Sequence, residues 1–206
     1  MKSLLAGGQK ALAMRALNME HEGSGSPQLS ELVGLATTVT GMTCQVEKIG
    51  PFAWLKFTFA GMSMTVTDAA GSGSSSSKKL FDFVPQGLIC IGSRQDYTAF
   101  AEDALITTAA GDAVHVLGLG SVAADAGDKA LTGTEVDFAP VTGDITNSGG
   151  TGAGTKFGGQ GSVIDGTTTA ADLYLNWSGS AATIDANGTI TVTGTVELVI
   201  LMLGDD

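Results

Sequence analysis

One glycine-rich stretch of the sequence has a spacing of residues that could bind a nucleotide. Gly118-Leu119-Gly120-Ser121-Val122-Ala123 follows a strand-like run and fits the G-x-G-x-x-G/A pattern of dinucleotide-binding turns. That pattern works only where a helix begins at the turn, so that its amino end faces the pyrophosphate. Here Ala124-Asp125-Ala126-Gly127-Asp128 allows at most one helical turn, and no second βαβ unit follows. The sequence therefore predicts no nucleotide site.

The other groups of catalytic type are too scattered for a known mechanism. Residues 149–156 lack the Gly-Lys-Ser/Thr order of a phosphate loop, and Asp144-Ile145-Thr146-Asn147 lacks the ligand ladder of a calcium loop. Only His21 and His115 are present, so we expect neither a zinc cluster nor a Ser-His-Asp triad; His115 should be a packed strand residue. A carboxylate pair for glycoside hydrolysis stays open. We predict no catalytic residues, no cofactor and no metal, in a protein that is not an enzyme.

Composition and charge point to a β-rich protein with a biased surface. Of 206 residues, 15% are charged and 30 are Gly, and the net charge is −11. Residues 1–95 carry eight Lys/Arg and six Asp/Glu (+2), whereas residues 96–206 carry two and fifteen (−13). Such an acidic second half is unsuited to nucleic acid, which needs clustered Lys and Arg. We therefore expect no nucleic-acid partner, and no run of the sequence suggests a membrane span.

Cysteine usage and the N-terminus indicate where the chain is made. Cys44 and Cys90 lie far apart in strand-like runs, which favours two buried free thiols, although a single bridge between them stays open. Gly7-Gly8-Gln9-Lys10 interrupts the apolar stretch after Lys2, so no signal peptide is expected. These features predict synthesis in a cytoplasm.

Strand patterning begins at Gly41. The predicted strands are residues 42–48, 52–59, 62–67, 80–84, 87–93 and 112–119, with turns at Gly50-Pro51 and Gly61. The serine-rich stretch 71–79 and the Gly/Thr-rich stretch 142–161 are predicted as loops from their composition. Residues 31–206 should form one β-sandwich domain, and between Ala124 and Thr134 we expect a loop that has room for one helical turn.

Two C-terminal strands organise this domain. Residues 171–178 and 189–203 both alternate with period two, and Asn187-Gly188 between them predicts a tight hairpin. The stretch 198–203 is apolar on both faces, so its outer face must also be covered. Burial inside one sandwich is the leading interpretation, and burial at a protein–protein contact is the alternative.

The first 30 residues differ from the rest and predict a non-β N-terminal arm and linker. Leucines could line a short amphipathic helix among unopposed cations, and Gly23-Ser24-Gly25-Ser26-Pro27 is typical of a linker. The arm is either loosely packed or docks on an apolar or acidic protein surface. Together with the last strand it gives these candidate partner-binding residues: Lys2, Leu4, Leu5, Lys10, Leu12, Arg15, Leu17, Val199, Leu201 and Leu203.

Several stretches resemble capsid decoration (cement) proteins of tailed bacteriophages. They are Val66-Thr67-Asp68-Ala69-Ala70-Gly71-Ser72-Gly73 with Lys79-Leu80-Phe81-Asp82-Phe83, Leu117-Gly118-Leu119-Gly120-Ser121-Val122-Ala123 with Leu131-Thr132-Gly133-Thr134-Glu135, and Thr191-Val192-Thr193-Gly194-Thr195-Val196. The resemblance spans about residues 62–205. It implies a jelly-roll-like β-sandwich, made in the cytoplasm of a bacterial host, that binds neighbouring major capsid proteins on the virion surface and stiffens the shell against packaged DNA. It also implies a small homo-oligomer, a trimer or dimer.

Two other functions stay open at this point. A carbohydrate- or receptor-binding β-sandwich, as in a head fibre, would bind through Trp54 or Trp177. A hydrolase on a β-sandwich is the third class.

Overall fold

The computed structural model describes residues 33–67, 74–102, 115–125, 130–142, 151–158, 163–179 and 187–204. Within these ranges the chain forms ten β-strands, one short 3-10 turn and no α-helix. The elements are β1 (Gly34–Ala36), β2 (Met42–Ile49), β3 (Phe52–Val66), β4 (Ser74–Phe83), β5 (Gln86–Glu102), β6 (His115–Gly120), η1 (Gly133–Glu135), β7 (Thr151–Gly158), β8 (Val163–Gly166), β9 (Asp172–Gly179) and β10 (Gly188–Gly204).

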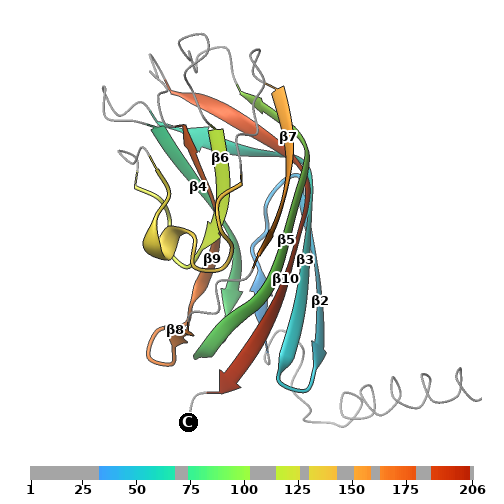
Figure 1. Cartoon of the computed structure of the whole chain (residues 1–206), viewed down its shortest axis with the longest axis vertical. Coiled ribbons are helices and arrows are strands. Elements are labelled where there is room, and N and C mark those ends of the chain that lie inside the picture. The colour runs from blue at the N-terminus through green and yellow to red at the C-terminus, as the bar shows by residue number, and fades with distance from the viewer. Residues whose placement is uncertain are drawn as a thin grey trace, which may run out of the picture.

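Two antiparallel sheets pack face to face as a jelly-roll-like β-sandwich (Figure 1). Sheet A has the strand order β1-β4-β9-β6, and sheet B has the order β2-β3-β10-β5-β7. Strand β8 extends sheet B beside β7, because both pair with successive parts of β5. The all-β fold predicted from the sequence is confirmed. The predicted N-terminal arm, residues 1–30, lies outside the described residues.

The hydrophobic core fills the space between the sheets. Along each strand every second side chain points inward, so apolar residues at that period meet across the sandwich. Phe57 of β3 and Phe81 of β4 are fully buried, and their rings pack edge to face with centroids 6.3 Å apart. Phe83 stacks on Phe138, which comes from the segment after η1, with centroids 5.5 Å apart. The core is therefore built from this segment as well as from the strands.

The predicted turn at Gly50-Pro51 is confirmed, but Gly61 has another role. Gly50, with φ of 58°, makes the tight turn between β2 and β3. Gly61, with φ of 71°, lies inside β3 and forms a β-bulge, so that Val192 of β10 pairs with Met62 and Gly194 pairs with Phe59. The two short strands expected here are one strand of 15 residues, because a bulge bends a strand without ending it.

The predicted hairpin between the two C-terminal strands is wrong. Strand β9 pairs with β4 and β6 in sheet A, whereas β10 pairs with β3 and β5 in sheet B. The two strands are consecutive in the chain but lie in different sheets, and the apolar side chains of both contribute to the shared core. Alternation and an Asn-Gly turn are equally compatible with a hairpin and with a crossing between sheets, so local signals could not separate the two.

Two predicted loops are partly strands. Ser74-Ser75-Ser76-Ser77-Lys78-Lys79 belongs to β4, where Ser76 donates a hydrogen bond to the Thr65 carbonyl (2.5 Å) and Ser77 donates one to Asn176 (2.6 Å). Residues 151–158 form β7, which pairs with β5 through its backbone. Composition misled in both cases, because partners distant in the sequence satisfy the hydroxyls of β4 and the main chain of β7.

Candidate protein-binding face

The outer face of sheet B carries an apolar row that crosses five strands. The strand register places Ile49, Phe52, Leu201, Ile89 and Val163 side by side, one from each of β2, β3, β10, β5 and β8. Their sequence neighbours Ala53, Ile200 and Leu88 point inward and are fully buried. The row itself is open to solvent: Ile49 is 65% exposed, Phe52 42% and Val163 64%.

Apolar residues on both sides of this row extend it into a patch. Trp54 pairs with Val199 on the same outer face, and Ile91 bulges from β5 between Cys90 and Gly92. Ile91 is 48% exposed and Leu203, near the end of β10, is 49% exposed. We call these nine residues the apolar patch: Ile49, Phe52, Trp54, Ile89, Ile91, Val163, Val199, Leu201 and Leu203.

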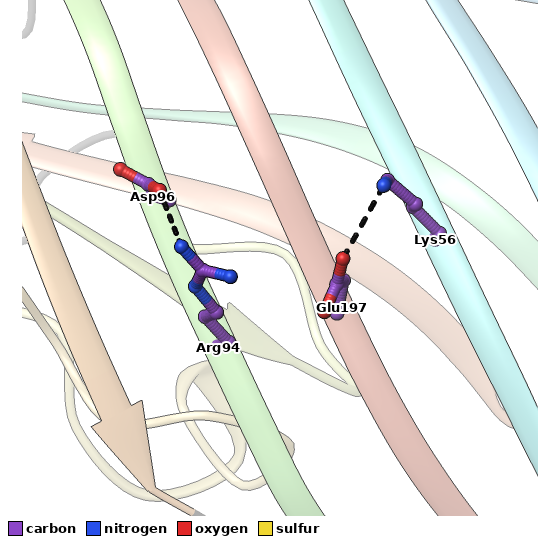
Figure 2. Close-up of polar contacts among 4 residues, drawn as sticks. All are labelled: Lys56, Arg94, Asp96 and Glu197. Carbon is purple, nitrogen blue, oxygen red and sulfur yellow. Dashed lines mark hydrogen bonds and ion pairs between the residues drawn. The ribbon is translucent and has the colours of Figure 1, made fainter.

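A band of charge bounds the patch on the same face (Figure 2). Lys56 of β3 forms an ion pair with Glu197 of β10 at 3.4 Å, and Arg94 of β5 forms one with Asp96 at 2.9 Å. All four side chains are partly exposed, so each pair contributes little to stability. Beyond the band the face becomes polar, with Thr58 opposite Thr195. The face therefore changes along the strands from apolar to charged to threonine-rich.

The outer face of sheet A is covered, in contrast to that of sheet B. Asn176 of β9 is fully buried there and makes four hydrogen bonds. Its amide nitrogen donates to the carbonyls of Val122 (2.9 Å) and Glu135 (2.8 Å), and its oxygen accepts from Ser77 (2.6 Å) and the Ala124 backbone (3.2 Å). The segments around η1 are thereby held against the sheet. Within the described ranges, no element is layered in the same way on the outer face of sheet B (Figure 1).

The glycines of the nucleotide-like motif serve this packing. A Cβ on Gly118 would lie 2.7 Å from Val136, and one on Gly120 would overlap the backbone of Glu135 and Thr134. Both positions let the η1 segment approach β6 closely. The pattern at residues 118–123 thus reflects a close contact between backbones, and the turn that follows it is not the start of a helix.

The sequence-predicted site residues divide into two groups. Val199, Leu201 and Leu203 lie together in the apolar patch, on the outer face of β10. Lys2, Leu4, Leu5, Lys10, Leu12, Arg15 and Leu17 lie outside the described residues. The stretch 198–203 was expected to be buried on both faces within one sandwich. Only its inner half, Leu198, Ile200 and Met202, is buried, because no second layer of the described chain covers the other half.

Six residues of the patch were not predicted from sequence as protein-binding residues, and of these only Trp54 was named, for glycan binding. Ile49, Phe52, Trp54, Ile89, Ile91 and Val163 come from four other strands, and each alone has the pattern of an ordinary strand residue. Only the register reveals that they are neighbours. The one available signal was that strands β3, β5 and β10 are apolar on both faces near one end.

The remaining candidates for chemistry have structural roles. His115 is buried at one end of the core, 5.6 Å from the Trp177 ring. Cys44 and Cys90 are free thiols, as favoured from sequence, but only Cys90 is buried, whereas Cys44 is half-buried. Burial raises the pKa of each to about 11. Among the described residues, no three His, Cys, Asp or Glu side chains gather as metal ligands. In the same ranges no helix is long and apolar enough to cross a membrane.

An ionic cluster joins β4 and β9 on sheet A. Lys79 forms ion pairs with Asp82 and with Asp172, the latter at 2.9 Å, and Tyr174 donates a hydrogen bond to Asp172 at 3.0 Å. Partial burial alone would raise the pKa of Asp172, but hydrogen bonds from Lys79 and Tyr174 outweigh it and hold that pKa below its ordinary value. The cluster therefore favours the ionised carboxylate and fastens the two strands.

Comparisons with known proteins assign no family. No family model matches the chain, and no curated protein matches it. Among solved structures, a chain of the cyanophage Pam1 capsid asymmetric unit is similar at 13% identity and a TM-score of 0.30, covering 86% of this chain and 98% of that one. The xylan-binding module CBM15 is similar at 12% identity and a TM-score of 0.32, with 84% and 97% covered. The mannan-recognising module TmCBM27 has 11% identity and a TM-score of 0.28, with 80% and 86% covered.

Proposed function

We propose that this chain is a non-catalytic structural protein of a virus particle, which binds neighbouring capsid subunits through the outer face of sheet B. The observation that carries the proposal is the apolar patch. Five of its side chains are between 42% and 65% exposed. Large exposed apolar patches on soluble proteins mark sites of protein–protein contact.

The shape of the patch suits attachment to a protein. It lies on a hydrogen-bonded sheet held from behind by a packed core, so little conformational entropy is lost when it is covered. The bounding charges are already paired within the chain, which leaves the apolar centre as the main source of binding energy. Aromatic Phe52 and Trp54 provide the kind of anchor that dominates such contacts.

The finer proposal is a decoration protein on the outer capsid surface of a tailed phage. Its partner would be the major capsid protein, and its role would be to join neighbouring subunits and resist the pressure of packaged DNA. Many copies on one shell would turn a modest contact into stable attachment. We also propose a small homo-oligomer and synthesis in the cytoplasm of the bacterial host.

Replacing Leu201 with Asp tests the proposal. The charge would be placed at the centre of the patch, so co-sedimentation with shells of the proposed partner, a major capsid protein of a tailed phage, should fall at least tenfold, a loss of about 1.4 kcal/mol or more. Because Leu201 points outward, the free energy of unfolding should change by only about 0.5 kcal/mol.

A matched control lies on the same strand and face. Thr195→Asp adds the same charge at the threonine-rich end and should leave shell binding unchanged. Equal binding by wild type and Leu201→Asp would remove the patch from the interface, and absence of wild-type binding would contradict the proposed partner.

Carbohydrate binding is the second candidate, and one observation favours it. Phe52 and Trp54 lie two residues apart on the same outer face of β3, where two aromatic rings could stack on sugar rings. Trp177 is fully buried and cannot contact a glycan. Titration with soluble xylan and mannan oligosaccharides should change the fluorescence of wild type but not of Trp54→Phe if this function is correct.

A further inference from the structure

The apolar patch needs a cover before any partner is met. With side chains of roughly 150–200 Å² each, its nine residues expose on the order of 500 Å², at the upper end of the largest patches on monomers. No described element covers it. A bare patch of this size on many copies in one cell would promote self-association.

The N-terminal segment enters the sandwich at the end where the patch lies. The Val33 carbonyl accepts a hydrogen bond from Val84 (3.1 Å), and Gly34 pairs with Phe83 at the end of β4. Strand β5 begins three residues after Phe83, at Gln86, so it starts at this same end and soon reaches Ile89 of the patch. The hairpin turn of Gly50 is also there, because the Pro51 carbonyl accepts from Met202 at 2.8 Å.

The segment before Val33 has residues that complement the patch. Leu5, Leu12 and Met19 recur every seven residues, so a helix would carry them on one side. From residue 5 to 19 such a helix is about 21 Å long. The apolar row crosses five strands, four spacings of about 4.8 Å, or about 19 Å in total.

Charge complements this match of length. Before Glu20 the segment has Lys2, Lys10 and Arg15 and no acidic residue, a formal charge of +3. The outer face of sheet B has four acidic side chains and two basic ones, a difference of −2, and both basic ones are paired within the face: Glu47, Asp96, Asp165, Glu197, Lys56 and Arg94. The segment therefore meets a face of opposite sign.

We propose that residues 1–19 of the same chain bind across the apolar patch in the free protein and leave it when a shell subunit takes their place. Residues 20–32, if extended, reach about 40 Å, enough to connect Val33 to either edge of the row. Tethering at this distance gives an effective concentration of about 1 mM, which favours the same chain over a second copy. The inference rests on the proposed function only in one respect, namely that shell subunits bind this same outer face of sheet B.

Tryptophan fluorescence tests the inference, because Trp54 lies in the patch and the second tryptophan, Trp177, is fully buried. We expect acrylamide to quench Trp54 severalfold more strongly in a chain lacking residues 1–19 than in the full chain. Trp54→Phe should abolish the difference. A synthetic peptide of residues 1–19 should restore protection to the shortened chain.

Two double variants separate apolar contact from charge. In the variant with Leu5→Asp and Leu12→Asp, acrylamide should quench Trp54 as strongly as in the shortened chain. The variant with Ala6→Asp and Ala13→Asp carries the same added charge at the neighbouring positions, and its Trp54 should be protected as in the full chain. Equal quenching of full and shortened chains would overturn the inference. So would a full chain that light scattering shows to be a dimer and that loses protection on dilution, since a second copy would then be the cover.

Shell binding is measured separately. If the shortened chain is unprotected yet binds shells, both proposals stand. If it is unprotected and neither form binds shells, only the proposed function fails.

Discussion

Asn176 shows how one side chain can hold a loop on a sheet. All four of its hydrogen bonds go to groups on other segments, and it has no exposed surface. A buried amide is stabilising only when its partners are complete, because each unpaired polar group costs free energy. This residue therefore links sheet A to the segments that cover it.

Asn176→Ala should lower the free energy of unfolding by about 3 kcal/mol, because it removes a fully buried amide together with its hydrogen bonds to the carbonyls of Val122 and Glu135. Urea denaturation measures the change. The exposed strand residue Thr189 provides the control, since Thr189→Ala should change stability by only about 0.5 kcal/mol. Equal effects would show that the hydrogen bonds of Asn176 are not important for stability.

The ionic cluster around Lys79 predicts a pH dependence. The pKa of Asp172 is lower in the folded chain than in the unfolded chain, where it is about 3.9. Its stabilising contribution is therefore full above that unfolded value and is lost as the pH falls through the folded pKa. The stability difference between wild type and Asp172→Asn should be constant near neutral pH and shrink below about pH 4.

Urea midpoints measured across this range check the sign. A difference that grows on acidification would mean that burial, and not the hydrogen bonds from Lys79 and Tyr174, controls the pKa of Asp172.

At the level of elements, the sequence located most strands but did not show which strands pair with one another. Period-two alternation correctly located most strands, because alternation records which side chains face the core. It did not identify the sheet to which each strand belongs, so β9 and β10 were expected to pair. The serines of β4 and the glycines of β7 were assigned to loops, because their hydrogen-bond partners are distant in the sequence. The hydroxyls of β4 bond to residues 11 and 99 positions away, and the backbone of β7 pairs with β5.

The candidate site was foreseen only in part for the same reason. The apolar outer positions of β10 were visible as a run, and three of them were proposed as partner-binding residues. The other six became neighbours through the register of five strands, which no local pattern specifies.

Close contact between elements gives a third prediction. Gly120→Ala should destabilise the fold by about 3 kcal/mol, because its Cβ would overlap the Glu135 backbone, which cannot move as a side-chain end can. Gly92→Ala is the matched control, since its Cβ would have only Val199 within range, at 4.0 Å. Thermal unfolding of the two variants measures the contrast. Equal midpoints would mean that the η1 segment is free to shift.

For the whole molecule, the important asymmetry is between the two outer faces. The face of sheet A is covered by the segments around η1, and the described face of sheet B is open and apolar at one end. A sandwich needs only one inner face per strand to be stable. The outward apolar residues of sheet B are thus surplus to folding, and the binding to another surface that we propose would explain them.

Electron cryomicroscopy of shells decorated with this chain tests that explanation most directly. We predict density for the β-sandwich on the shell, with Phe52, Trp54 and Leu201 of sheet B against the capsid subunits and sheet A turned to solvent. Density in which sheet A contacts the shell and the apolar patch faces solvent would contradict the account.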